Sequence, residues 1–124
     1  MCKIFIGDIK KGNNMEENNT VLCACSAYER KYYLNEEFNG LPDRVKNELQ
    51  IACVIFTEDV GGILTIYFDE DGSLVLHPQK DETDVLYDDV GCGLKLRQLE
   101  MEKAELFEQM EQYYKVFIRQ ESSM

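Results

Sequence analysis

Apolar positions recur in steps of three and four along residues 41–60. This spacing places them on one face of a helix. Pro42 suits the first helical position because its ring already fixes φ and its missing N–H costs no hydrogen bond. Asp43 follows, where a negative charge meets the positive end of the helix dipole. The pattern therefore predicts a helix over residues 42–60, although the apolar run 51–56 taken alone would also fit a strand.

The helical pattern stops at the glycine pair 61–62, which ends the helix because glycine adopts a left-handed C-cap conformation without steric cost. Residues 63–68 are rich in β-branched and aromatic side chains and predict a strand. The acidic turn 69–72 ends in glycine and reverses the chain. Residues 73–77 return as the partner strand, and we expect Pro78 to end the pairing. Both faces of this hairpin are fairly apolar, so we expect helices to cover one face and the other face to be partly covered.

A second hairpin precedes the helix. Residues 20–27 and 31–34 both read as strands, although the turn between them lacks a glycine, and residues 35–40 form a loop into the helix. The element order is thus β-β-α-β-β-α, which predicts an α+β fold: an antiparallel sheet of two hairpins, a central helix and a long C-terminal helix. This order loosely resembles profilin-like and Roadblock modules, an analogy that carries no function.

The C-terminal helix is predicted from a long uninterrupted pattern. Residues 85–90 form a short helix or first turns, and the glycines around Cys92 are expected to kink the chain. Nothing interrupts the pattern over residues 94–119, so we expect one helix on the order of 39 Å long at about 1.5 Å per residue. Its apolar residues form a heptad seam that Lys103 interrupts. The predicted interaction surface consists of Leu96, Leu99, Leu106, Met110, Tyr113 and Phe117.

The two ends of the chain differ from its centre. Residues 1–19 are polar and turn-prone, and form either a poorly structured extension or one edge strand at residues 3–6. Met15 is an alternative start. The single α+β domain then spans residues 20–119, and residues 120–124 form a tail.

Composition narrows the classes of function. The 124 residues have a hydrophobic fraction of 44%, which supports a globular fold, and a formal net charge of −11. An acidic surface repels phosphate backbones and anionic lipids, so we expect neither a nucleic-acid nor a membrane partner. No apolar run approaches the roughly 20 residues that span a bilayer. The five cysteines form no CxxC pair, and no secretory leader is evident, which favours free thiols in a cytoplasmic protein.

Candidate catalytic and metal-binding residues each lack partners. Cys23 and Cys25 share a strand face, but a structural zinc site needs a second pair at ligand spacing. Cys92 lies near a helix start, where a thiolate is stabilised, yet the acidic residues before it oppose its ionisation. His77, the one histidine in the chain, is distant in sequence from these cysteines. We therefore expect no enzyme, no metal and no cofactor.

Two segments resemble a known family. Residues 33–42 read YLNEEFNGLP and residues 57–65 read TEDVGGILT. Together with the acidic turn and the long C-terminal helix, they resemble an uncharacterised family of small acidic bacterial proteins, classed as a domain of unknown function. The resemblance covers about residues 20–118, and it implies no activity.

The leading hypothesis is a non-enzymatic, cytoplasmic interaction module. The C-terminal helix is expected to overhang the sheet, and an overhanging apolar seam needs a partner protein or a second subunit. The alternative for this helix is that it packs on its own sheet. The alternative function is a small-ligand-binding regulatory domain, with a pocket between sheet and helix near Tyr32, Tyr33, Phe38 and Tyr67.

Overall fold

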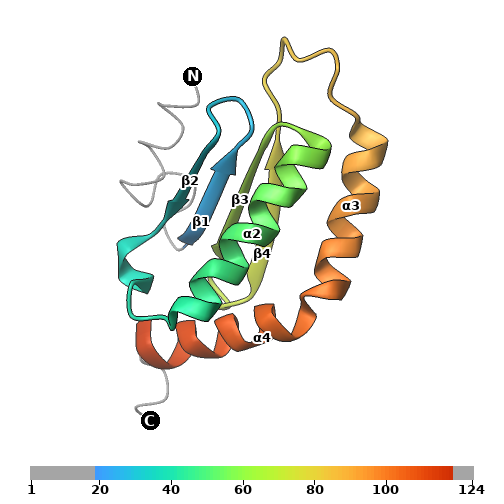
Figure 1. The fold of residues 1–124 in the computed structure, drawn as a ribbon. Helices are drawn as coiled ribbons and strands as arrows, with labels where there is room; N and C mark the ends of the chain where they lie inside the picture. Colours follow the sequence, from blue (N-terminus) through green and yellow to red (C-terminus); the bar gives the residue numbers. More distant parts are fainter. Residues whose placement is uncertain (1–18, 119–124) are drawn as a thin grey trace.

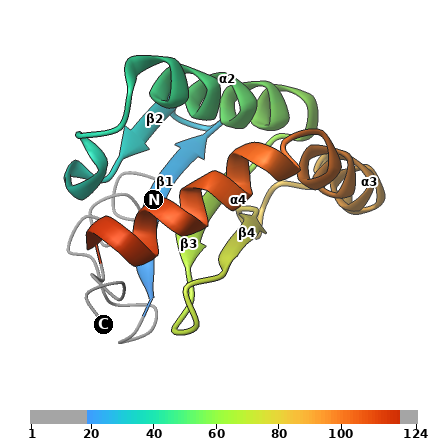
Figure 2. The ribbon, with the colours of Figure 1, turned by 90° about the horizontal axis from the view of Figure 1, so that it is seen from below.

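The computed structural model describes residues 19–118, which form a sheet with all of their helices packed on one face (Figures 1 and 2). The strands are β1 (Thr20–Ser26), β2 (Lys31–Leu34), β3 (Ile63–Phe68) and β4 (Leu74–Gln79). They pair antiparallel in the order β2-β1-β3-β4. The predicted α+β class, the antiparallel sheet and the β-β-α-β-β order are thus confirmed. The N-terminal extension, its edge strand, the alternative start and the tail lie outside the described residues.

A bulge in β1 directs two consecutive side chains towards the helices. The pairing of β1 with β3 shifts register between Val21 and Cys23. Such an insertion breaks the strict alternation of a strand. As a result Leu22 and Cys23 both join the core under the helices, whereas Val21 and Ala24 pack with tyrosines on the opposite face.

The helix α2 spans Asp43–Val60, with Pro42 as its N-cap. The whole segment is helical, so the alternative of a strand over residues 51–56 is excluded. Its buried face packs on β1 and β3, and Gly61 caps its C-terminus at φ 87°. Gly62 follows at φ 75°, and a Cβ there would collide with the carbonyl oxygen of Gln79. Glycine is therefore needed at this position for two reasons: the positive φ and the close approach of the β4 backbone.

Two details before and after α2 differ from the sequence predictions. The loop before α2 contains a turn of 3₁₀-helix, Glu36–Phe38, whose Phe38 is fully buried and stacks on Phe68 with ring centroids 5.7 Å apart. Pro78 does not end the pairing of β4, which continues to Gln79. Proline is tolerated there because β4 is an edge strand, where the missing N–H faces away from the sheet.

The prediction of one C-terminal helix over residues 94–119 is wrong. The chain forms α3 (Asp89–Glu102) and α4 (Ala104–Tyr113), followed by a π-helical turn at Tyr114–Ile118. Lys103 separates the helices at φ −111° and ψ 22°, and α4 then runs across the end of the sheet (Figure 1). The glycines around Cys92 do not interrupt α3, which runs through them.

The break at Lys103 has a packing reason. A straight continuation of α3 would run past the sheet and leave its apolar residues in water. Turning at Lys103 buries Leu106, Met110 and Tyr114 against the core, and the Tyr114 ring stacks on Phe68 with centroids 4.3 Å apart. In addition, a Glu111 carboxylate oxygen accepts a hydrogen bond of 2.8 Å from the backbone N–H of Leu74, at the start of β4.

Candidate functional site

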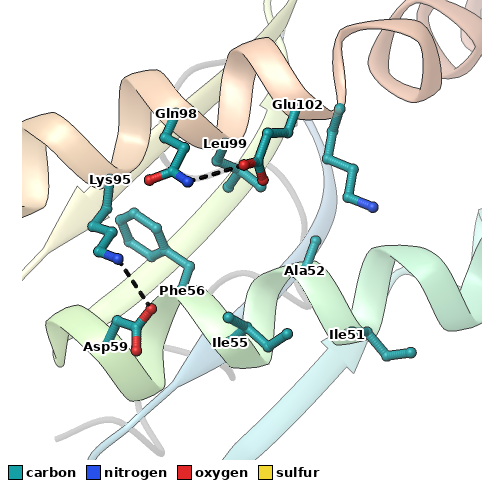
Figure 3. A pocket seen from close by; sticks show the side chains of 10 residues that line it. Ile51, Ala52, Ile55, Phe56, Asp59, Lys95, Gln98, Leu99 and Glu102 are labelled. Atoms are coloured by element: carbon teal, nitrogen blue, oxygen red, sulfur yellow. Dashed lines mark hydrogen bonds and ion pairs between the residues drawn. The ribbon is translucent and has the colours of Figure 1, made fainter.

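A groove of about 230 Å³ runs between α2 and α3 on the outer side of the helical layer (Figure 3). Its floor consists of the buried side chains Phe56 and Leu99, which belong to the core under the helices. The α2 wall carries Ile51 and Ile55, which are 57% and 55% exposed. Residues four apart stack on one side of a helix, so these two isoleucines form a continuous apolar wall.

Two ion pairs beside the groove join α2 to the C-terminal part of the chain. Lys95 Nζ lies 3.5 Å from Asp59 Oδ2, and Lys103 Nζ lies 3.1 Å from Glu48 Oε2. These side chains are partly exposed, so each pair contributes at most about 1 kcal/mol to stability. Their effect is to fix the separation of the helices and therefore the width of the groove.

The helix α3 also carries exposed apolar side chains. Gln98 lines the groove and donates a hydrogen bond of 2.9 Å to Glu102. Leu94 and Met101 lie four residues before and three after Gln98, and therefore in the same row of side chains. They are 68% and 72% exposed. We call the surface formed by Ile51, Ile55, Leu94 and Met101 the α2–α3 face.

The predicted heptad seam does not form an exposed surface. Leu99, Leu106 and Met110 are buried in the core of the same chain, and Leu96 and Tyr113 are partly buried against it. Of the six predicted interaction residues, Phe117 alone is mainly exposed, at 63%. The seam is therefore mainly an intramolecular packing surface, as the alternative interpretation of the helix stated, and the exposed apolar residues lie in other rows.

The four aromatic residues predicted to line a ligand pocket do not lie together. Tyr32 and Phe38 pack on the helical side of the sheet, whereas Tyr33 and Tyr67 pack with Val21 and Ala24 on the other side. Neighbours along a strand point to opposite faces, which separates Tyr32 from Tyr33. Phe38 is moreover part of the core and has no exposed surface.

A second cavity, of about 440 Å³, does lie between sheet and helix, and Tyr32 is the one predicted residue that lines it. It opens between the second half of α2 and the turn that joins β1 to β2. We call it the hairpin cavity. It is lined by Cys25, Ser26, Ala27, Arg30, Lys31, Tyr32, Gln50, Val54, Thr57, Glu58 and Gly61.

Cys23, Cys25 and Cys53 form a packed cluster next to this cavity. Cys23 Sγ lies 3.8 Å from Cys53 Sγ, and Cys25 Sγ lies 3.4 Å from Thr57 Oγ1. The hydrogen bond to Cys23, together with burial, raises the pKa of Cys53, and burial raises the pKa of Cys25. Protonated thiols are poor nucleophiles and poor metal ligands. Within residues 19–118, no three His, Cys, Asp or Glu side chains are arranged to hold a metal ion.

Cys92 lies apart from this cluster, near the start of α3. Its thiol sulfur lies 2.9 Å from the hydroxyl of Tyr87, which donates a hydrogen bond to it. Burial, and then this contact, raise the pKa of Tyr87, so the tyrosine is in its neutral form. The surroundings of Cys92 thus supply a hydrogen-bond donor and contain no histidine that would act as a base.

The fold and these sites define a small two-layer α+β domain with a grooved helical surface. Residues 19–122 match a family of unknown function, DUF6145, and the chain belongs to that family. This confirms the resemblance to a domain of unknown function. No curated protein and no solved structure matches the chain. Among the described residues, none of the helices is both long and apolar enough to cross a bilayer.

Two sets of site residues were missed from the sequence. Ile51 and Ile55 lie outside the buried stripe of α2, and no site was predicted for them. They are exposed because only one layer of helices covers the sheet (Figure 2). Arg30 was also missed, although the absence of glycine from the β1–β2 turn was a usable signal.

Proposed function

We propose that this domain is a non-enzymatic interaction module that binds a protein partner, or a second copy of itself, through the α2–α3 face. The observation that carries the proposal is the exposure of four large aliphatic side chains, each more than half accessible, of which Ile51 and Ile55 line a groove with an apolar floor. Exposed large apolar side chains that gather on neighbouring helices mark interaction sites on soluble proteins. The surface belongs to α3 as well as α2, so the C-terminal part of the chain keeps its proposed role with different residues.

The expected strength of such a contact follows from the area available. Burying the exposed half of an Ile, Leu or Met side chain contributes roughly 1 kcal/mol. Four such residues give on the order of 4 kcal/mol before the entropic cost of association is subtracted. The face therefore suits a reversible contact in which surrounding polar groups also take part, and it does not suit an obligate interface, which is larger and more apolar.

Charge and thiol chemistry support the rest of the proposal. The groove rim is built from charged side chains already engaged in pairs, such as Lys95 with Asp59, and these supply no free acid or base for catalysis. The net charge of −11 disfavours nucleic acid as the partner. The free thiols of Cys23, Cys25, Cys53 and Cys92 are typical of a reducing compartment, which supports the proposed cytoplasmic location.

The test is site-specific photo-cross-linking in cells that express the full chain. A photoreactive amino acid replaces Ile55 on the α2–α3 face, and the matched control replaces Val85, which is 88% exposed in the loop before α3. We expect a cross-linked species heavier than the monomer with the probe at Ile55, and its loss when Ile51 is also changed to Glu. Cross-linking only at Val85, or at neither position, would refute the proposal.

A second candidate function has its own observation. The hairpin cavity lies between sheet and helix, where the alternative hypothesis placed a ligand, and its volume of about 440 Å³ lies within the range of small-molecule sites. It shares no lining residue with the α2–α3 groove. Ligand binding and partner binding are therefore independent proposals, and a regulatory domain would use both.

A further inference from the structure

We infer that the hairpin cavity binds a small organic carboxylate, held by Arg30 and Lys31, whose body carries a hydrogen-bond donor. This inference goes beyond the interaction module and does not depend on it.

Arg30 has the backbone conformation of a glycine. Its φ of 54° makes it the one non-glycine residue with positive φ among residues 19–118. A side chain there costs roughly 1 kcal/mol relative to glycine. Strain of this kind concentrates at functional sites, and here the strained residue lines a cavity.

The positive charges of Arg30 and Lys31 are not neutralised within the described part of the chain. The ion pairs found there use Lys80, Lys95 and Lys103. Arg30 and Lys31 are exposed and adjacent in the chain, and both line the cavity, so two positive charges lie on one side of it. The planar guanidinium group matches a carboxylate through two parallel hydrogen bonds, and an ammonium group beside it adds charge.

The opposite side of the cavity limits what the ligand can be. Val54 and Cys25 supply apolar surface, whereas Gln50 and Glu58 of α2 are polar. Glu58 is the one acid in the lining, so it repels a second negative charge and accepts a hydrogen bond from a hydroxyl or amino group. The site therefore fits a carboxylate with a single negative charge and one donor group, such as a hydroxy acid or an amino acid. A phosphate, which carries more charge, fits it less well.

The inference is tested by thermal shift and titration calorimetry on the full chain. The probes are leucine and 2-hydroxyisocaproate, the corresponding amides, which lack the carboxylate charge, and inorganic phosphate, each at millimolar concentration. We expect at least one of the two carboxylates to raise the melting temperature, and neither its amide nor phosphate to do so. No shift with either carboxylate, or an equal shift with phosphate, would overturn the inference.

Variants of Arg30 separate binding from folding. Arg30→Gly relieves the strained φ, so the variant without ligand should melt at the same temperature as the wild type or higher. Its affinity for the carboxylate should nevertheless fall at least about tenfold, because a charge-assisted pair is lost. Lys31→Gln should weaken binding in the same direction. Arg97→Gln, an exposed arginine on α3 outside the cavity, is the matched control and should bind normally.

Full affinity in Arg30→Gly and Lys31→Gln would also overturn the inference, since it would place the ligand elsewhere. These outcomes leave the interaction module untouched, because its test depends on Ile51 and Ile55.

Discussion

Leu99 and Leu94 provide a sharp test of which side of α3 packs on the domain. They lie five residues apart on the same helix, yet Leu99 is 8% exposed and Leu94 is 68% exposed. Changing leucine to alanine removes three carbon groups, each worth about 0.8 kcal/mol when fully buried. With the term for the cavity that remains, Leu99→Ala should lower the free energy of unfolding by about 2–4 kcal/mol. Leu94→Ala should change it by less than about 0.5 kcal/mol.

The lower half of that range is expected for Leu99. Its side chain forms part of the floor of the α2–α3 groove, so neighbouring side chains have room to collapse towards the space that the substitution leaves. The loss still corresponds to a fall in melting temperature of roughly 10 °C or more for a domain of this size.

The assay is urea unfolding followed by circular dichroism, with light scattering on the same samples. The denaturant slope should be the same in both variants and the wild type, so that midpoints report stability directly. The reasoning would be refuted if Leu99→Ala were as stable as Leu94→Ala and instead changed the molecular mass in solution. That result would make Leu99 an interface residue, as the heptad seam originally predicted.

Two further predictions concern a glycine and a thiol. Gly62→Ala should lower the free energy of unfolding by more than about 2 kcal/mol, because of the positive φ and the collision with the Gln79 carbonyl. Gly93→Ala, with open space on α3, should leave the free energy of unfolding unchanged or raise it by up to about 1 kcal/mol. Equal urea midpoints for the two variants would contradict this prediction. The hydrogen bond to Cys23 and burial raise the pKa of Cys53 above the ordinary value of 9.0. The folded state thus holds this proton more tightly than the unfolded state, so the contribution of this thiol to stability should be constant below about pH 8 and fall as pH rises above the unfolded pKa. Cys53→Ala should reduce that alkaline loss, and an identical pH profile in the variant would argue against the assignment.

The strands and α2 were predictable from local signals. Residues 63–68 are rich in β-branched and aromatic side chains and lie between glycines and an acidic turn, and steps of three and four mark residues 41–60. The order of the strands in the sheet could not be read in the same way, since the pairing of β1 with β3 depends on contacts between distant parts of the chain. The bulge at Leu22 was equally hidden, because it changes which face a residue occupies without changing the composition of β1.

The C-terminal region shows where periodicity misleads. A heptad seam states which side of a helix is apolar, but not whether that side meets a partner or the same chain. The sheet was available to bury Leu106 and Met110 once the helix turned at Lys103, and no residue type in the sequence forbids a straight helix there. The prediction that Tyr32 and Tyr33 line one pocket was wrong for a simpler reason, since adjacent residues of a strand point to opposite faces. That conflict was visible in the sequence itself.

The termination of the sheet has a consequence for how this protein behaves when concentrated. A sheet with two open edge strands can grow by adding strands from other molecules, which leads to aggregation. At one edge, β2 has only four residues and begins with Lys31. At the other edge, β4 contains Pro78, and the N–H of Leu74 already donates a hydrogen bond to Glu111. Both edges therefore resist strand addition. The protein should stay dispersed at high concentration, and its associations should be made by side chains instead of backbone.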